Sequence, residues 1–146
     1  MPEARPLATS RYLALDHGRR RIGVAVADAE TRIAFARPAI RARSEDAAIA
    51  EVARLARAEA ASCVIIGLPL HADGTEGEQA HVARAFGAKL SALGVEVLFH
   101  DERLSTWQAG AELTGADRRP DRGSGELDSA AARVILQDYL DSKEHR

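Results

Sequence analysis

Four acidic residues stand where apolar segments of the sequence end, and carboxylates in such places can hold catalytic cations. Asp16 closes one apolar run, Asp101 and Glu102 directly follow another, and Asp128 opens the last helical segment. Hydrolysis of a phosphodiester needs an activated water and relief of charge on the leaving oxygen, and two cations about 3.5–4 Å apart supply both. Mg²⁺ and Mn²⁺ prefer carboxylate oxygens, so acids that converge at one sheet edge would suit this chemistry.

Each of these acids also has a purely structural explanation. Asp16 is a good turn residue, Asp101 and Glu102 suit the start of a helix, and an aspartate such as Asp128 is a common N-cap. Asp16, however, ends a strand expected to be central, where a carboxylate needs a partner or a metal ion. Asp128 shares a helix face with apolar residues three and seven positions later. Taken singly, each signal is weak.

The segments that carry these acids alternate strand and helix patterns in the order βββαβαβαα. Short apolar runs predict five strands, near residues 11–16, 22–27, 32–37, 62–68 and 95–99. The first three are joined by short polar turns, which predicts an antiparallel meander, and the others follow helices, which predicts parallel crossovers. The expected fold class is therefore α/β, a mixed five-stranded sheet with helices on its faces.

Capping residues mark where the helices should begin. Ser44 precedes two acids that suit a first helical turn. Thr75 and Glu78 have the spacing of a capping box, which predicts a helix start at that point. The last helix is expected from about residue 126 to 140. Residues 115–125, which hold Gly, Pro, Asp and Arg, are expected to form a loop.

Length and composition predict one domain over residues 11–141, with tails at 1–10 and 142–146. Cys63 is the one cysteine, which excludes an internal disulfide and a Cys-rich metal site, and its apolar neighbours predict a buried thiol. No apolar run reaches the length of a membrane span, and the N-terminus lacks a secretion core. The expected location is therefore the cytoplasm, with no membrane partner.

The net charge of −2 is unevenly distributed along the chain. Residues 11–43 carry a net +5 and residues 44–146 a net −7. Arginine supplies 18 of the 20 basic residues. Arginine suits bidentate phosphate contacts, although genomic base composition would explain the excess equally well. The charge pattern permits a nucleic-acid partner without requiring one.

Three sets of arginines are candidate nucleic-acid contacts: Arg19, Arg20 and Arg21, then Arg103, and then Arg118, Arg119 and Arg122. The first set lies beside Asp16 and could grip a phosphate backbone, or form only a solvated turn. Arg103 adjoins the acids and could stabilise charge on a phosphoryl group, or hold one of those acids in an ion pair. The third set falls in the expected loop and could close over a bound strand, or touch only water.

Four motifs, in this order and spacing, resemble the YqgF family, also called RuvX, of nucleases similar to Holliday junction resolvases. The motifs are residues 15–28 (LDHGRRRIGVAVAD), 66–69 (IGLP), 101–106 (DERLST) and 127–131 (LDSAA). Residues 135–140 (ILQDYL) fit the usual ending of the family. The resemblance covers roughly residues 11–141, and the combination of motifs is highly specific.

The resemblance implies a ribonuclease-H-like fold and a nuclease that matures the 5′ end of the precursor of 16S ribosomal RNA. The resemblance implies that Asp16, Glu102 and Asp128 are the catalytic and metal-binding acids of the family. It also implies Mg²⁺ or Mn²⁺ as the cofactor. Precursor ribosomal RNA or single-stranded RNA is then expected in preference to junction DNA. Compared with true junction resolvases, the fourth strand ends at Gly67 without a glutamate, and position 131 is alanine. The site resembles a three-carboxylate version in which Glu102 replaces the acid of the fourth strand.

Three other functions stay open at this point. One is a nucleotide-binding fragment of the actin and sugar-kinase type, whose Asp-x-Gly hairpin is matched by residues 16–18, although such proteins need two domains around the nucleotide. Another is a scaffold that binds RNA without cleaving it. The third is a resolvase acting on four-way DNA, which would require a two-fold symmetric dimer.

Overall fold

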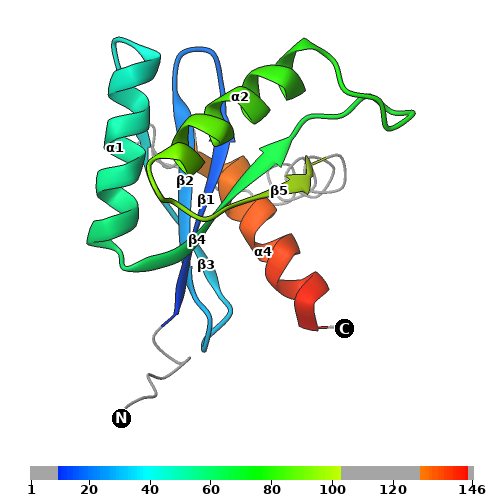
Figure 1. The fold of residues 1–146 in the computed structure, drawn as a ribbon. Helices are drawn as coiled ribbons and strands as arrows, with labels where there is room; N and C mark the ends of the chain where they lie inside the picture. Colours follow the sequence, from blue (N-terminus) through cyan, green and yellow to red (C-terminus); the bar gives the residue numbers. More distant parts are fainter. Residues whose placement is uncertain (1–9, 103–128, 145–146) are drawn as a thin grey trace.

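The computed structural model describes residues 10–102 and 129–144 of the chain. The described strands are β1 (Arg11–His17), β2 (Ile22–Asp28), β3 (Ala34–Ile40), β4 (Ala61–Leu68) and β5 (Val97–Asp101). The described helices are α1 (Glu45–Ala58), α2 (Glu78–Ala92) and α4 (Ala130–Glu144). Together they form a five-stranded sheet with helices on both faces, as Figure 1 shows.

The strands lie in the order β3-β2-β1-β4-β5, with β1 at the centre. β1 pairs antiparallel with β2, and β2 pairs antiparallel with β3, which confirms the predicted meander. β1 pairs parallel with β4, and β4 pairs parallel with β5, which confirms the predicted crossovers. The carboxyl ends of β1, β4 and β5 therefore meet at one edge of the sheet, where ligands commonly bind in open α/β sheets.

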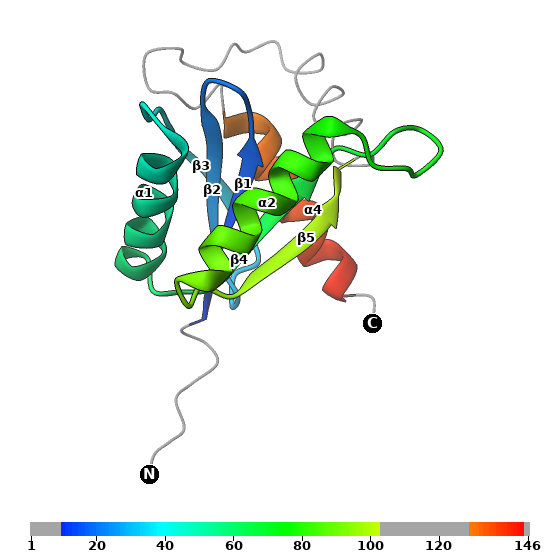
Figure 2. The ribbon, with the colours of Figure 1, turned by 45° about the horizontal axis from the view of Figure 1, so that its top comes forward.

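The two faces of the sheet are packed with residues of different size. On the face covered by α1 and α2, β1 presents Leu13 and Leu15 to a core built around Phe86. On the opposite face, covered by α4 (Figure 2), β1 and β2 present mostly small buried side chains such as Ala14 and Ala25, and Tyr12 packs against Tyr139 of α4. Strand side chains alternate between the two faces, so the alternation of large and small residues along β1 produces this difference. The small residues leave room for α4 to pack closely on the sheet.

Two strands lie further along the chain than the sequence predicted. β3 covers residues 34–40 rather than 32–37, and β5 covers 97–101 rather than 95–99. β3 is an edge strand that contains Pro38, and its pairing with β2 shifts register between Ile22 and Val24. A proline cannot donate a ladder hydrogen bond and is tolerated at an edge or a bulge. Its presence made this strand hard to delimit from the sequence.

The start of α1 was predicted correctly, and the start of α2 was not. Ser44 caps α1, its hydroxyl accepting a hydrogen bond of 3.1 Å from the Ala47 amide. α2 begins after Gly77, without a side-chain cap, so the predicted capping box of Thr75 and Glu78 is wrong. Thr75 bonds instead to Asp73, through both its amide and its hydroxyl. In the described part of the chain, none of the helices is long and apolar enough to cross a membrane.

Cys63 lies on β4 and is buried, as its apolar neighbours predicted. Burial, with a smaller effect of the Glu96 charge, raises the pKa of the thiol to about 11. A thiol with so high a pKa stays protonated at neutral pH and is a poor nucleophile. The residue is therefore part of the core beneath α4.

Candidate active site

The side chains of Asp16 and Glu102 meet at the carboxyl ends of the parallel strands. Asp16 is the second-last residue of β1, and Glu102 directly follows β5, two strands away. Strand alternation puts Asp16 on the same face as Ala14, which packs beneath α4. The expectation that acids at these strand ends would converge is therefore met for this pair.

Gly67 of β4 lies between the two strands and makes this approach possible. A Cβ added at Gly67 would come 3.4 Å from the carboxyl carbon of Glu102 and 2.6 Å from Cδ1 of Ile135 on α4. The second contact is closer than real Cβ atoms allow. A larger residue would force the Ile135 side chain to shift and would narrow the space that the Glu102 carboxyl group occupies. The absence of a side chain at Gly67 thus leaves room for the acid that follows β5.

Asp16 and Glu102 are hydrogen-bonded to each other, and both are partly buried. Burial is the main cause that raises the pKa of Glu102 to about 7, with further increases from the charge and hydrogen bond of Asp16 and from the charge of Asp101. Burial also raises the pKa of Asp16, against the opposing effects of Glu102 and His17. Without a cation, the pair therefore holds a proton that two exposed carboxylates would have lost.

Ser129 anchors the start of α4 to the sheet. Its side chain is fully buried. The hydroxyl accepts a 2.9 Å hydrogen bond from the Val24 amide of β2 and donates one of 2.5 Å to the Arg37 carbonyl of β3. These two strands change register at that point, so the serine satisfies backbone groups that the ladder leaves unpaired. Sequence reasoning gave Ser129 no role, although a polar residue just before three alanines was a usable signal.

A second polar link joins β5 to α4. His100 Nε2 lies 2.6 Å from Asp138 Oδ2, and both side chains are mostly buried. His100 stands two residues before Glu102 and, by alternation, shares its face of the sheet. The link therefore ties the strand that carries Glu102 to the helix above it. Sequence reasoning did not identify this link, which joins residues 38 positions apart.

His17 and the hairpin arginines lie on the other side of β1 from Asp16. The His17 ring packs against Phe86 of α2, with ring centroids 4.7 Å apart. Arg19 and Arg20 are exposed in the β1–β2 turn, and with Arg21 they line a cavity on the α1 and α2 face. The sequence had grouped these arginines with Asp16 because they are adjacent in the chain.

Gly18 holds this turn in shape. Its amide donates a 3.1 Å hydrogen bond to the Arg21 carbonyl, and an added Cβ would lie 2.7 Å from that same oxygen. Glycine is therefore required at this position by the closeness of the backbone. The turn in consequence presents three consecutive arginines at the edge of the sheet.

Five of the predicted site residues lie outside the described part of the chain. They are Arg103, Arg118, Arg119, Arg122 and Asp128. The predicted 115–125 loop and the first residues of the predicted last helix lie outside it as well. Their assigned roles stay predictions.

The donor chemistry of the described pair fits a hard divalent cation. Both groups offer carboxylate oxygens, and a buried pair that shares a proton can exchange that proton for a metal ion. Within residues 10–102 and 129–144, no group of three or more Asp, Glu, His or Cys side chains gathers as a complete metal site would. Asp16 and Glu102 would thus be two of the three predicted ligands, and their role as ligands stays a prediction.

Comparison with solved structures defines the class of fold. The chain is similar to T. thermophilus RuvC in complex with a Holliday junction substrate, with a TM-score of 0.61 and 14% identity over 93% of this chain and 96% of that one. It is also similar to the large terminase nuclease of the thermophilic phage G20c, with a TM-score of 0.56 and 12% identity over 88% and 81% of the two chains. The fold is ribonuclease-H-like, as the motifs predicted.

Comparison of sequences defines the family. The profile of the RuvX family, described as Holliday junction resolvase, matches residues 10–142. A relative from Chloroflexus aurantiacus, named "Putative pre-16S rRNA nuclease", is 43% identical over 132 residues, which is 90% of this chain and 86% of the relative. A relative of the same name from Anaeromyxobacter sp. strain Fw109-5 is 42% identical over 134 residues, covering 91% and 98%. The chain belongs to the RuvX family.

Proposed function

We propose that the protein is a metal-dependent nuclease that hydrolyses phosphodiester bonds while maturing the 5′ end of the 16S ribosomal RNA precursor in the cytoplasm. The observation that carries the proposal is the partly buried, hydrogen-bonded pair of Asp16 and Glu102 at the carboxyl edge of the parallel strands. The RNA substrate comes from the name of the curated relatives. The fold and the family are those of proteins described as nucleases and resolvases.

In this proposal Asp16 and Glu102, with Asp128 as the third carboxylate, hold Mg²⁺ or Mn²⁺. The bound cation supplies an activated water and relieves charge on the leaving oxygen. Asp16 and Glu102 would hold the cation as carboxylates, so the proton that the pair shares would be released when a cation binds. Ser129 and the His100–Asp138 link position these acids, because they join α4 to β2, β3 and β5.

The proposed role of the arginines is to hold the phosphate backbone. Arg19, Arg20 and Arg21 occupy a turn that begins two residues after Asp16. Arginine offers planar, paired donors that match phosphate oxygens. Arg103, Arg118, Arg119 and Arg122 are proposed to share this role on the strength of the sequence alone.

The test is a cleavage assay with three substrates in parallel. Purified protein with Mg²⁺ or Mn²⁺ is given precursor 16S ribosomal RNA, unrelated single-stranded RNA and four-way junction DNA. We expect cleavage of the RNA precursor, its loss in EDTA, and its loss in Asp16→Asn. The matched control is Asp46→Asn, which removes an exposed carboxylate on α1, far from the pair along the chain. Binding of the precursor without cleavage at any metal concentration would instead establish an RNA-binding scaffold.

Junction DNA is the second candidate substrate because two findings favour it. The family is described as Holliday junction resolvase, and RuvC bound to a junction has a similar fold. Cleavage of the junction at a rate above that of the RNA would replace the RNA assignment. Such cleavage should come with a dimer in solution, since a two-fold junction needs paired active sites.

A further inference from the structure

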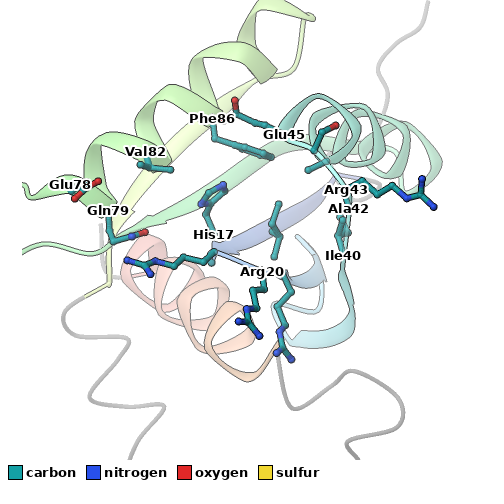
Figure 3. A pocket seen from close by; sticks show the side chains of 16 residues that line it. His17, Arg20, Ile40, Ala42, Arg43, Glu45, Glu78, Gln79, Val82 and Phe86 are labelled. Carbon is teal, nitrogen blue, oxygen red and sulfur yellow. The ribbon is translucent and has the colours of Figure 1, made fainter.

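A cavity of about 500 Å³ opens on the sheet face opposite the acid pair. It lies between the β1–β2 turn, the segment that joins β3 to α1, and the first turns of α2. We call it the hairpin cavity, and Figure 3 shows His17 at its centre, with Val82 and Phe86 of α2 on one side and Ala42 on the other. Its volume falls within the range of roughly 300–1,000 Å³ that is usual for sites of small organic ligands.

The base of the hairpin cavity is apolar and includes one aromatic surface. Ile22, Ile40 and Ala48 are buried side chains that line it. The imidazole of His17 is half-buried and packs on the buried ring of Phe86, which holds it in place. No described residue forms a hydrogen bond with His17 Nδ1, although that atom is buried. The half-buried imidazole is therefore the aromatic surface that a ligand in the cavity can contact.

The rim of the hairpin cavity is predominantly cationic. Arg19 and Arg20 approach from the turn and Arg43 from the start of α1, and all three are exposed. Two acids also line the cavity: Glu78 is exposed, and Glu45 is paired with Lys89 at 2.6 Å. An apolar base with an aromatic ring and an arginine rim is the combination that binds single-stranded nucleic acid, because bases stack while phosphates meet cations.

We propose that the hairpin cavity binds one nucleotide of the single-stranded substrate, beside the phosphodiester held at Asp16. Asp16 and His17 are consecutive residues whose side chains lie on opposite faces of β1. A strand that passes over this end of β1 can therefore reach both faces within a few nucleotides. The inference rests on the proposed function, because it identifies where the same substrate strand continues. The base contacts His17, and its phosphates contact the arginines of the rim.

The test uses the full chain in EDTA, so that binding is measured without cleavage. The probes are a trinucleotide RNA, AMP and inorganic phosphate, and the signals are the imidazole resonances of His17 and the methyl resonances of Val82. We expect the trinucleotide to shift both sets. Ala42→Trp, which fills the cavity from its exposed rim, should raise the Kd for the trinucleotide at least about tenfold. Ala50→Trp, an exposed position on α1 that does not line the cavity, should leave the Kd unchanged.

Kinetics with the metal present separate this inference from the proposed function. Ala42→Trp should raise KM for the RNA about tenfold and leave kcat within about twofold, as expected for lost ground-state binding. Asp16→Asn should abolish cleavage and still bind the trinucleotide in the cavity. Active wild-type enzyme with an unchanged KM in Ala42→Trp would overturn the inference alone. Binding of AMP or phosphate as tight as that of the trinucleotide would overturn the assignment to a substrate strand.

Discussion

The two faces of the sheet at the carboxyl end of β1 differ in charge and packing. The face beneath α4 holds two partly buried acids, and α4 is tied to the sheet there by Ser129. The opposite face holds an open cavity with exposed arginines and a half-buried histidine. The acidic face and the arginine-lined face are separated by Asp16 and His17, whose side chains point to opposite sides of β1. One strand end can therefore hold a cation on one face and a polyanion on the other.

The largest effect should come from the acid pair itself. Asp16→Asn keeps the shape of the side chain and removes the charge that would hold a cation, so we expect cleavage to fall by about 10³-fold. The folded state should gain stability without metal, because a buried charged group is replaced by a neutral one. Cleavage rates and thermal unfolding at matched folded fraction check both parts. Wild-type cleavage in this variant would refute the assignment of the site. Asp128→Asn should behave in the same way.

Glycine substitutions on the two faces should separate loss of function from loss of stability. Gly67→Ala forces a contact with Ile135 near Glu102, and Gly87→Ala forces a 2.6 Å contact with the Phe99 ring on the other face. Each should cost about 1–3 kcal/mol of unfolding free energy. Only Gly67→Ala should also lower the cleavage rate per folded molecule, by about tenfold. Equal losses of cleavage per folded molecule would show that the α4 face has no special role.

The buried serine should contribute to stability through its two hydrogen bonds. Ser129→Ala leaves the Val24 amide and the Arg37 carbonyl without a partner beneath α4. We expect the unfolding free energy to fall by about 1–3 kcal/mol, measured by denaturant titration. The affinity for Mn²⁺ should weaken as well, since α4 loses its anchor to β2 and β3. A stability loss with unchanged Mn²⁺ affinity would limit the serine to a structural role.

The pH dependence of stability should follow the raised pKa of Glu102. The folded protein holds a proton up to about pH 7, whereas the unfolded chain releases it near the ordinary glutamate pKa of 4.5. The native state therefore binds more protons in that window, and stability falls as pH rises from about 4.5 to 7 and levels off above 7. We expect Tm of the metal-free protein to fall by about 5 °C across this range. Asp16→Asn should flatten the profile, and Mg²⁺ should offset the fall at pH 8.

The sequence predicted those features that depend on local patterns. The ends of the predicted strands indicated that Asp16 and the acids at 101 and 102 could meet at one sheet edge, and the family resemblance then pointed to Glu102. The Ser44 cap needed only its own helix turn. The capping box at Thr75 failed because Asp73, two residues earlier, competes for the same hydroxyl and amide. Local rules do not decide between such competing partners.

Features that join distant segments could not be predicted. The Ser129 bridge joins positions about a hundred residues apart, and the His100–Asp138 link joins a strand to a helix. Each depends on how α4 lies across the sheet, which no single segment specifies. The hairpin cavity likewise exists only once three separate segments are packed together. Because Arg19, Arg20 and Arg21 follow Asp16 closely in the sequence, we expected them beside it. In the structure they line the cavity on the opposite face of the sheet.

The most direct test of the account is to locate Mn²⁺ in crystals of the full-length protein. Crystals soaked in Mn²⁺ at pH 8, where the acid pair has lost its shared proton, are examined by anomalous scattering. We expect a peak within about 2.2 Å of carboxylate oxygens from both Asp16 and Glu102, and no such peak in crystals of Asp16→Asn. Mn²⁺ bound elsewhere, with the two carboxyl groups still hydrogen-bonded to each other, would contradict the assignment of this pair as the catalytic site.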